Sequence, residues 1–240
     1  MRVEMPGVDD AVLESVLDNA VWHSLAGAHE AFAEREGQAA RYDPDVSVFG
    51  GLGDDTDAGW RDLEAVVGSS GIAVLFRAEL PQLPAGWTRL DGGRGHQMVL
   101  RDADAVHTTP EVPQARPLGA DDVGEMLALV EIARPGPFAV RTIDLGGYVG
   151  VFDGDRLVAM AGQRLAPPGF REISAVCTHP EFRGRGLAAG LTALVARAIL
   201  QRGERPFLHH ASDNHPARRV YEALGFEFRR QVVFAALGAP

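Results

Sequence analysis

Residues 173–203 read ISAVCTHPEFRGRGLAAGLTALVARAILQRG, and they predict a buried strand, a glycine-containing turn and a long amphipathic helix. The first six residues are all apolar or small, as expected for a strand that is covered on both faces. Pro180 cannot continue a central ladder, so the strand must end near it. Apolar residues then recur at helical spacing from Leu187 to Ile199, and Gly203 supplies a stop.

The turn between this strand and this helix, from Arg183 to Ala188, predicts an anion-binding site. Gly184 and Gly186 allow the backbone to approach a ligand without a Cβ in the way. Free backbone N–H groups and the positive end of the helix dipole would converge there. A pyrophosphate is the most natural ligand for such a turn.

The composition is that of an ordinary globular protein. Of the 240 residues, 46% are hydrophobic and 23% are charged. No apolar run approaches the roughly 20 residues needed to cross a bilayer, and the acidic N-terminus does not resemble a signal peptide. The single cysteine, Cys177, excludes an internal disulfide and a multi-cysteine metal site. We therefore expect a cytoplasmic protein with no membrane partner and no metal.

The charged residues restrict the function classes further. All 23 basic residues are arginine, so a Walker A loop and a Schiff-base lysine are excluded. A net charge of −10 argues against general nucleic-acid binding. Between Arg183 and Arg230, however, nine arginines face only four acidic residues. This local basic excess suits a small polyanionic ligand. The sequence does not indicate an oligomeric state.

Residues 107–117, HTTPEVPQARP, contain three prolines and predict a linker between two domains. We expect an N-terminal α/β domain over residues 1–110 and a second domain over residues 115–240. The elements expected in the first domain are helices at 9–20 and 24–36, a strand within 40–52, a helix that starts after a cap at Thr56 or Asp57, a strand within 71–80 and a hairpin over 87–100. None of these elements carries a chemical signature.

The second domain shows a more regular order of elements. It starts with a helix that ends before Pro135, followed by a hairpin around Asp153-Gly154-Asp155 and then by the strand, turn and helix of residues 173–203. A strand at 206–212, a helix at 216–224 and a closing strand at 226–237 follow. This order predicts an α/β sheet with mixed strand directions.

Two interpretations compete for the glycine turn. The pattern Gly184-x-Gly186-x-x-Ala189, with Glu204 downstream, formally matches a dinucleotide-binding fingerprint. However, the turn comes late in the chain and follows an antiparallel hairpin, whereas doubly wound folds start with this unit. Glu204 also lies in a helix-ending turn and not at the end of a second strand.

The alternative is carried by two ordered motifs. Arg183-x-x-Gly186-x-Ala188 follows a strand that ends in His179-Pro180, and Asn214, Ala217, Tyr221 and Gly225-Phe226 follow the next strand. In these motifs the segment from about residue 115 to 237 resembles the GNAT acyltransferase family. The resemblance implies an α/β (α+β) fold with a GNAT-like mixed central sheet flanked by helices, here preceded by a smaller α/β domain.

The resemblance also implies a co-substrate and the residues that bind it. The co-substrate would be acetyl-CoA or another short-chain acyl-CoA, and the acceptor a primary amine of a small molecule or peptide. The pantetheine arm would lie along the backbone of Val176, Cys177 and Thr178. The pyrophosphate would bind the amides of Arg183, Gly184, Arg185, Gly186, Leu187, Ala188 and Ala189, and Asn214 and Tyr221 would add further cofactor contacts.

Attack of an amine on a thioester needs a deprotonated amine, a polarised carbonyl and a proton for the sulfur. Tyr221 suits the last role, because a phenol with a pKa of about 10 is protonated at neutral pH; the alternative is a tyrosine that only packs on the closing strand. Glu172 is the candidate base, because some family members place a glutamate nearby, although a solvated charge flanking the strand is the plainer interpretation.

Three histidines compete with Glu172 for the role of base: His179, His209 and His210. His209 and His210 point to opposite faces of a strand, so at most one can line the cleft, and a zinc site is not expected. Cys177 raises the alternative of an acyl-enzyme, but nothing in the sequence activates its thiol, so direct transfer is favoured.

The acceptor-binding loop, by the same resemblance, spans residues 134–148. Phe138, Arg141 and Tyr148 in this loop would suit an acceptor with an apolar part and a carboxylate. We also hypothesise that residues 1–110 are a degenerate copy of the same fold that forms a wall of the acceptor cleft. A non-catalytic CoA-binding or sensing module is the alternative function.

Overall fold

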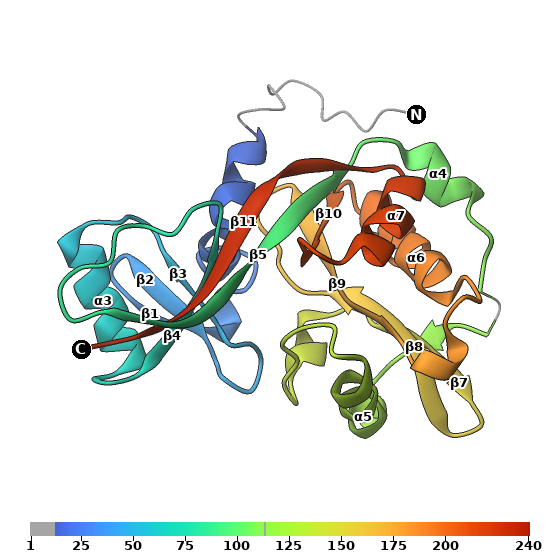
Figure 1. Cartoon of the computed structure of the whole chain (residues 1–240), viewed down its shortest axis with the longest axis horizontal. Coiled ribbons are helices and arrows are strands. Elements are labelled where there is room, and N and C mark those ends of the chain that lie inside the picture. Colours follow the sequence, from blue (N-terminus) through green and yellow to red (C-terminus); the bar gives the residue numbers. More distant parts are fainter. Residues whose placement is uncertain (1–12, 113) are drawn as a thin grey trace.

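The structure is a computed structural model that describes residues 13–112 and 114–240, and its strands form one mixed eleven-stranded sheet (Figure 1). The order across the sheet is β1-β2-β3-β4-β11-β5-β10-β9-β8-β7-β6. The strands are β1 (Ala33–Glu36), β2 (Ala39–Tyr42), β3 (Phe49–Leu52), β4 (Ile72–Arg77), β5 (Thr88–Leu100), β6 (Arg116–Pro117), β7 (Val149–Asp153), β8 (Arg156–Gln163), β9 (Phe170–Thr178), β10 (Arg205–Ala211) and β11 (Phe226–Gly238).

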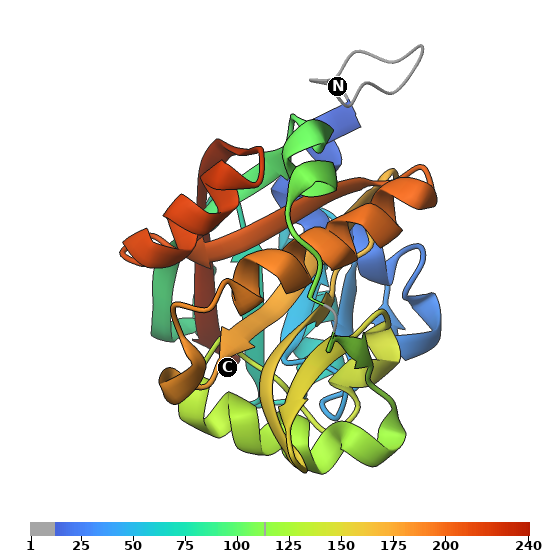
Figure 2. The ribbon, with the colours of Figure 1, turned by 90° about the vertical axis from the view of Figure 1, so that its right-hand side faces the viewer.

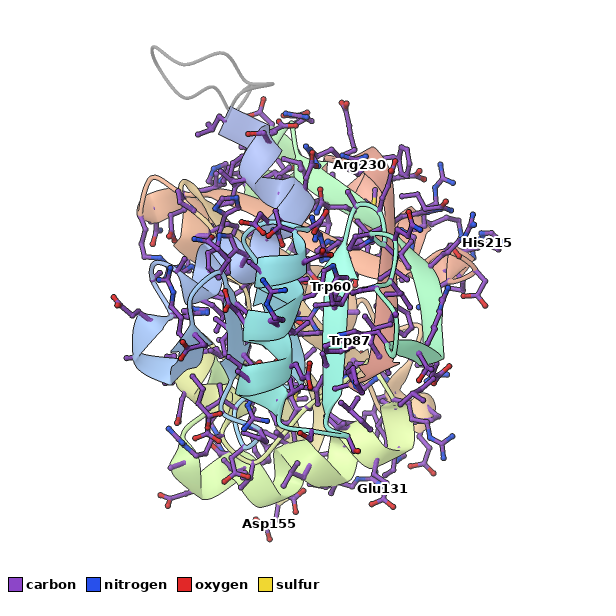
Figure 3. All side chains as sticks on the ribbon, turned by 90° about the vertical axis from the view of Figure 1, so that its left-hand side faces the viewer. Trp60, Trp87, Glu131, Asp155, His215 and Arg230 are labelled. Atoms are coloured by element: carbon purple, nitrogen blue, oxygen red, sulfur yellow. The ribbon has the colours of Figure 1, made fainter. Side chains whose placement is uncertain are left out.

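The helices among the described residues flank this sheet, and the mixed α/β fold predicted from the sequence is confirmed. The α-helices are α2 (Ala20–Leu25), α3 (Asp57–Val67), α4 (Ala103–Thr108), α5 (Val123–Ala133), α6 (Leu187–Gln201) and α7 (His215–Ala223). Short 3-10 helices are η1 (Ser15–Asn19), η2 (Glu30–Phe32), η3 (Ala120–Asp122), η4 (Thr142–Leu145) and η5 (Pro180–Phe182). Helices α6 and α7 cover one side of the molecule (Figure 2), and α3 lies on the opposite side (Figure 3).

Two parallel strand pairs have the same local topology. Helix α3 connects β3 to β4, and helix α6 connects β9 to β10, and in each case the two strands pair in parallel. The two halves of the chain also share a hydrophobic core. One buried cluster contains Tyr42, Phe49 and Phe76 from the N-terminal half and Phe170 and Phe207 from the C-terminal half. The two halves therefore share apolar burial as well as a sheet.

The two longest strands connect the halves. Strand β5 pairs antiparallel with β11 from Phe226↔Leu100 to Gly238↔Thr88. The C-terminal part of β5 also pairs with β10, and the C-terminal part of β11 also pairs with β4. Each half of the sheet is thus extended by a strand that comes from the other half, which covers edges that would otherwise be unpaired.

The hairpin predicted over residues 87–100 is wrong, because β5 continues through DGGRG as one strand. The glycines there serve close approach of the neighbouring strand. A Cβ on Gly92 would lie 2.4 Å from the carbonyl oxygen of Phe234 on β11, and one on Gly93 would lie 2.7 Å from the Phe234 ring. The glycines of this segment are therefore explained by close contact with β11 and not by a turn.

Other expectations for the N-terminal half have mixed outcomes. The helix expected at 24–36 ends at Leu25 and gives way to η2 and β1, and the strand expected within 40–52 is two strands, β2 and β3. The helix expected at 9–20 lies partly outside the described residues. Helix α3 is confirmed with Thr56 as its cap, since the Thr56 hydroxyl accepts a hydrogen bond from Gly59 N at 3.2 Å.

The sheet runs through the boundary that the sequence predicts near residues 110–115, and that boundary stays a prediction. The elements expected after it, from the helix α5 to the closing strand β11, are all present. Across residues 13–112 and 114–240, none of the helices has the length and apolar character of a membrane-spanning segment.

The shared sheet predicts that both halves unfold together. All three tryptophans (Trp22, Trp60 and Trp87) belong to the N-terminal half, so their fluorescence reports on that half. Leu191→Ala, on the buried face of α6 in the C-terminal half, should lower the free energy of unfolding by roughly 2–5 kcal/mol because it opens a core cavity. We expect the free energy of unfolding obtained from tryptophan fluorescence in urea to fall by this full amount. An unshifted transition would show that the halves unfold independently.

Candidate active site

Strands β9 and β10 separate part of the way along their length and leave an opening in the sheet. They pair in parallel from Phe170↔Arg205 to Ile173↔Leu208. Beyond that point β9 continues to Thr178 beside β8, and β10 continues to Ala211 beside β5. The edges of residues 174–178 and 209–211 that face each other therefore have no strand partner in the described sheet. Such backbone groups can pair with the amides of an extended ligand.

A β-bulge lies on β9 beside this opening. The β8–β9 register shifts between Met160 and Gly162, so two residues of β9, Ala175 and Val176, face the single Ala161. Ala175 has φ 53°, a left-handed conformation that costs a non-glycine residue on the order of 1–2 kcal/mol. Bulges of this kind bend a strand and re-aim its backbone groups. Val176, Cys177 and Thr178, the predicted pantetheine contacts, follow directly along this edge.

The N-terminus of α6 lies at the end of the same strand and is free to bind an anion. Its N-cap is Gly186 with φ 76°, which makes no side-chain cap, and its first turn contains no acidic residue. The backbone ladder begins with Gly190 N, which donates to Gly186 O at 3.0 Å, so the amides of Leu187, Ala188 and Ala189 have no intrahelical acceptor. These donors and the helix dipole favour a negatively charged group.

The turn itself is open on its outer side. A Cβ added at Gly184 (φ 78°) or Gly186 would meet no atom within 4 Å. Arg183 donates from Nε to Thr178 O at 3.4 Å, and Arg185 stacks on the Phe182 ring at 4.5 Å. The predicted phosphate-binding residues are therefore brought together, and their backbone fits a pyrophosphate at one end of the opening.

Tyr221 lies on α7, the helix that follows β10, and Asn214 is the N-cap of this helix. The Asn214 Oδ1 accepts a hydrogen bond from Ala217 N at 3.1 Å, so this side chain caps the helix. Tyr221 is buried and packs on the ring of Phe226. Burial raises the pKa of the Tyr221 phenol, and the nearby Cys177 thiol on β9 raises it further. Tyr221 is thus a phenol that stays protonated at neutral pH and lies near Cys177 of β9.

Glu172 is fully buried and has strong partners. The Arg164 guanidinium donates to its two oxygens at 2.6 and 2.8 Å, and His209 Nδ1 lies 2.8 Å from Oε1. Burial acts to raise the pKa of Glu172, but Arg164 and His209 outweigh it and lower the pKa to about 2. A carboxylate held in this way is a weak proton acceptor, so the geometry argues against the base role predicted for it.

The three histidines occupy three different environments. His209 points to Glu172, whereas His210 points to the opposite face and lies 6.0 Å from Tyr221 between ring centroids. Burial lowers the pKa of both rings. His179 precedes η5, where its Nδ1 accepts from Glu181 N at 3.4 Å. The expectation that His209 and His210 lie on opposite faces is confirmed.

Cys177 is a buried thiol and not an activated one. Burial raises its pKa to about 12, so its thiolate fraction at neutral pH is very small. Among the described residues, no three His, Cys, Asp or Glu side chains gather in a way that could hold a metal ion.

The predicted acceptor residues divide into two groups. Phe138 and Tyr148 pack edge to face at 5.7 Å, and the buried Tyr148 hydroxyl has no hydrogen-bond partner among the described residues. Arg141 instead forms ion pairs with Asp43 at 2.7 Å and Asp144 at 3.0 Å, and its backbone N–H donates to Asp45 O at 2.7 Å. Arg141 therefore links the 134–148 loop to the N-terminal half through its contacts with Asp43 and Asp45.

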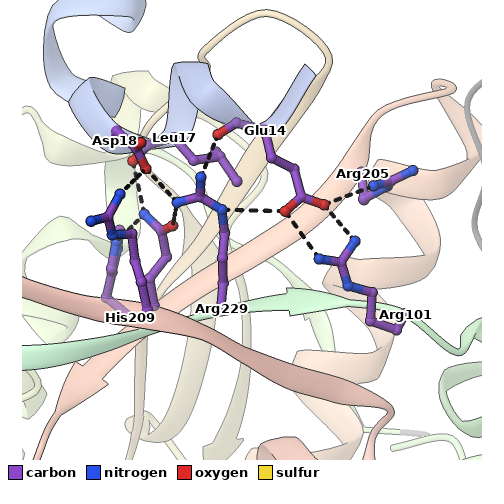
Figure 4. Close-up of polar contacts among 9 residues, drawn as sticks. Glu14, Leu17, Asp18, Arg101, Arg205, His209 and Arg229 are labelled. Carbon is purple, nitrogen blue, oxygen red and sulfur yellow. Dashed lines mark hydrogen bonds and ion pairs between the residues drawn. The ribbon is translucent and has the colours of Figure 1, made fainter. Parts of the chain in front are cut away.

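The sequence did not reveal a buried ionic network around Glu14, next to the start of β10 (Figure 4). Glu14 is surrounded by Arg101, by Arg205 at 3.2 Å and by Arg229 at 3.2 Å. The available signal was Arg205, a charged residue at the start of an apolar strand, since a buried charge must be paired. The partners come from segments far apart in the chain and cannot be read from it.

The C-terminal half of the chain, which contains the opening between β9 and β10, is similar to known proteins. The sequence profile of the family described as FR47-like protein matches residues 148–235. Mycothiol acetyltransferase from Mycobacterium ulcerans is 36% identical over 84 residues, which are 32% of this chain and 26% of that protein. The corresponding protein from Corynebacterium aurimucosum is 35% identical over 65 residues, 27% of this chain and 21% of that protein. The match thus spans about a quarter of these relatives.

Two solved structures match nearly the whole chain. A GNAT-family protein from Novosphingobium aromaticivorans is 36% identical, with a TM-score of 0.83 over 93% of this chain and 98% of that chain. A GCN5-related N-acetyltransferase from Kribbella flavida has a TM-score of 0.61 at 18% identity, over 92% of this chain and 96% of that one, and it supports the fold alone.

The open turn predicts that Gly186 is needed for anion binding. Gly186→Ala should weaken CoA binding by at least about tenfold, because a Cβ would stand where backbone meets phosphate and the left-handed φ would be strained. Gly203→Ala is the matched control: φ is 74° and a Cβ there also meets nothing within 4 Å, but it lies at the far end of α6. Calorimetric titration with CoA should separate the two variants. Equal affinities would contradict this assignment of the turn.

The Glu172 environment predicts a pH-dependent stability. The pKa of Glu172 is 4.5 as a free side chain and about 2 in the fold, so the unfolded chain takes up its proton first as the pH falls. The stabilisation is complete above about pH 5 and is lost on the way down to pH 2. Glu172→Gln should cost roughly 3–5 kcal/mol at pH 7, because Arg164 loses its counter-charge, and should flatten the acid slope. Urea unfolding from pH 7 to pH 3 measures both; parallel pH curves would contradict the prediction.

Proposed function

We propose, from the premise that this chain belongs to the GNAT family of acetyltransferases, that it transfers an acetyl group from acetyl-CoA to a primary amine of a small molecule or peptide. The family implies an acyl-CoA donor and an amine acceptor. The observation that carries the proposal is the opening between β9 and β10, which ends at the uncapped N-terminus of α6 and has Tyr221 beside it.

The donor would lie along this opening. Its pyrophosphate would accept hydrogen bonds from the amides of the turn and first helical residues, 184–189. Its pantetheine arm would pair with the free edge of Val176, Cys177 and Thr178. The bulge at Ala175 would direct backbone groups toward the thioester carbonyl, where preorganised N–H donors contribute most to acyl transfer.

The transfer would be direct. The amine nitrogen forms a bond to the acyl carbon, the carbon–sulfur bond breaks, and the departing sulfur takes a proton from Tyr221. The raised pKa of Cys177 supports direct attack over an acyl-enzyme, because a protonated thiol is a poor nucleophile. Glu172, already paired with Arg164 and His209, would not take up the amine proton in this scheme. That proton would pass to solvent water, and the Tyr221 phenolate would take its proton back from water.

The acceptor side would favour an apolar group. Phe138 and Tyr148 supply aromatic surface, and Val48 and Val140 are exposed apolar side chains on the two loops that the Arg141–Asp45 contact joins. Because the Arg141 guanidinium already pairs with two carboxylates, we no longer expect it to bind an acceptor carboxylate. The curated relatives, named as mycothiol acetyltransferases, match only 84 residues or fewer and support the donor half of this proposal.

The N-terminal half would be a degenerate copy of the acyltransferase unit. Its β3–α3–β4 unit repeats the parallel topology of β9–α6–β10. Its helix N-terminus differs in chemistry, because Thr56 caps α3 and Asp54 and Asp55 precede the cap. A phosphate would meet an occupied cap and negative charge there. One donor site per chain follows from this difference.

Tyr221→Phe tests the catalytic proposal. Loss of the proton donor should lower kcat by about 10²-fold or more while the Kd for acetyl-CoA stays near that of the wild type. The assay is release of CoA thiol in a screen of amino acids, polyamines, aminoglycosides and peptides, together with calorimetry. Tight acetyl-CoA binding with no thiol release from any acceptor would favour the alternative, a CoA-binding sensor.

A further inference from the structure

Four side chains form a hydrogen-bonded row across neighbouring strands at the level where β9 and β10 separate. Gln97 on β5 and His209 on β10 are cross-strand partners, with Gln97 Nε2 and His209 Nε2 3.0 Å apart. His209 Nδ1 lies 2.8 Å from Glu172 Oε1 on β9, and Glu172 binds Arg164, the residue that follows β8. We call Gln97, His209, Glu172 and Arg164 the cross-strand row.

The hydrogen bonds around Gln97 fix the tautomer of His209. Arg229 Nη1 donates to Gln97 Oε1 at 2.8 Å, which identifies the other amide atom as the nitrogen. Gln97 Nε2 donates to Leu17 O at 2.9 Å and therefore also donates to His209 Nε2. His209 Nε2 is thus the acceptor, and Nδ1 carries the proton that is donated to Glu172. Both ring nitrogens of a neutral histidine are satisfied.

The cross-strand row lies beside the last pair of the two strands. Ile173↔Leu208 is the last β9–β10 pair, Glu172 comes immediately before it on β9, and His209 comes immediately after it on β10. The bond between Glu172 and His209 therefore links the two strands at the start of the opening. The His209 ring is held between Phe76 at 4.3 Å and Phe207 at 5.6 Å between ring centroids. A buried network with every member satisfied is rigid.

We propose that His209 and Glu172 are positioning residues that fix the point where β9 and β10 separate, and with it the position of the donor thioester. Gln97, from the N-terminal half, would orient His209, so the N-terminal half would take part in shaping the donor site. This inference rests on the proposed acetyl-CoA site. Neither residue touches the reacting atoms in it; both act through the backbone of β9 and β10.

His209→Phe and His209→Asn test the proposal in the full chain. Phenylalanine keeps the aromatic packing but removes both hydrogen bonds, whereas asparagine retains a donor near the Nδ1 position. His209→Phe should raise the acetyl-CoA Kd and KM about tenfold or more and lower kcat, because small misplacements of a reacting group are costly, while the acceptor KM stays unchanged. His209→Asn should restore these values to within about threefold of the wild type.

Leu63→Val is the control for simple destabilisation, because it thins the core beneath α3, in the N-terminal half and away from the opening. It should lower the Tm and leave the acetyl-CoA Kd unchanged. Wild-type affinity and turnover in His209→Phe would overturn the positioning role alone. A wild-type chain that binds no acetyl-CoA would overturn the proposed function as well.

Nuclear magnetic resonance of the histidine rings gives a test that does not depend on the activity of any variant. The His209 ring, assigned by its loss in His209→Asn, should show the Nδ1–H tautomer and should shift on saturation with acetyl-CoA. An Nε2–H tautomer, or a ring that is unchanged by saturating acetyl-CoA, would overturn the proposal.

Discussion

The antiparallel pairing of β5 with β11 is the constraint on which the rest of the structure depends. Every other strand of the N-terminal half lies on one side of this pair in the sheet, and every other strand of the C-terminal half lies on the other. Because β5 also pairs with β10, and β11 also pairs with β4, neither half has a complete sheet without the other. The core shared by Phe76 and Phe207 reinforces this dependence, since burial of both rings requires both halves to be in place.

This pairing also supports the opening between β9 and β10. Two neighbouring strands with free backbone edges tend to close or to recruit another strand, because unpaired N–H and C=O groups are costly. Here β8 and β5 hold the outer edges of β9 and β10, so that only the inner edges are free. The Glu172–His209 bond then limits the separation, and burial strengthens it. The proposed donor site thus depends on the whole sheet, although its motif is local in sequence.

The distinction between features that are local in sequence and features that depend on the whole sheet explains how much of the fold and the site could be predicted. The strand, turn and helix of residues 173–203 have their signals within a few residues of one another, and they were predicted correctly. Strand β5 was misread as a hairpin because DGGRG has the composition of a turn, and the reason for its glycines is Phe234, more than a hundred residues away. The partners of Glu172 were not predicted, also because the interaction is not local in sequence. A buried carboxylate demands a counter-charge, but nothing near it in sequence says that Arg164 and His209 supply it.

The two parallel units differ in the chemistry of their helix N-termini, and this difference bears on the proposed donor site. Helices α3 and α6 occupy the same place in their strand–helix–strand units, and both present an N-terminus with free amides and a positive dipole end. At α3 the Gly59 amide is already bonded to the Thr56 cap, and the acidic residues Asp54 and Asp55 precede that cap. At α6 the cap position is a left-handed glycine, and the flanking charges are Arg183 and Arg185. Topology alone therefore does not make an anion site. An uncapped helix N-terminus with positive charge beside it favours an anion, and of these two helices only α6 has both.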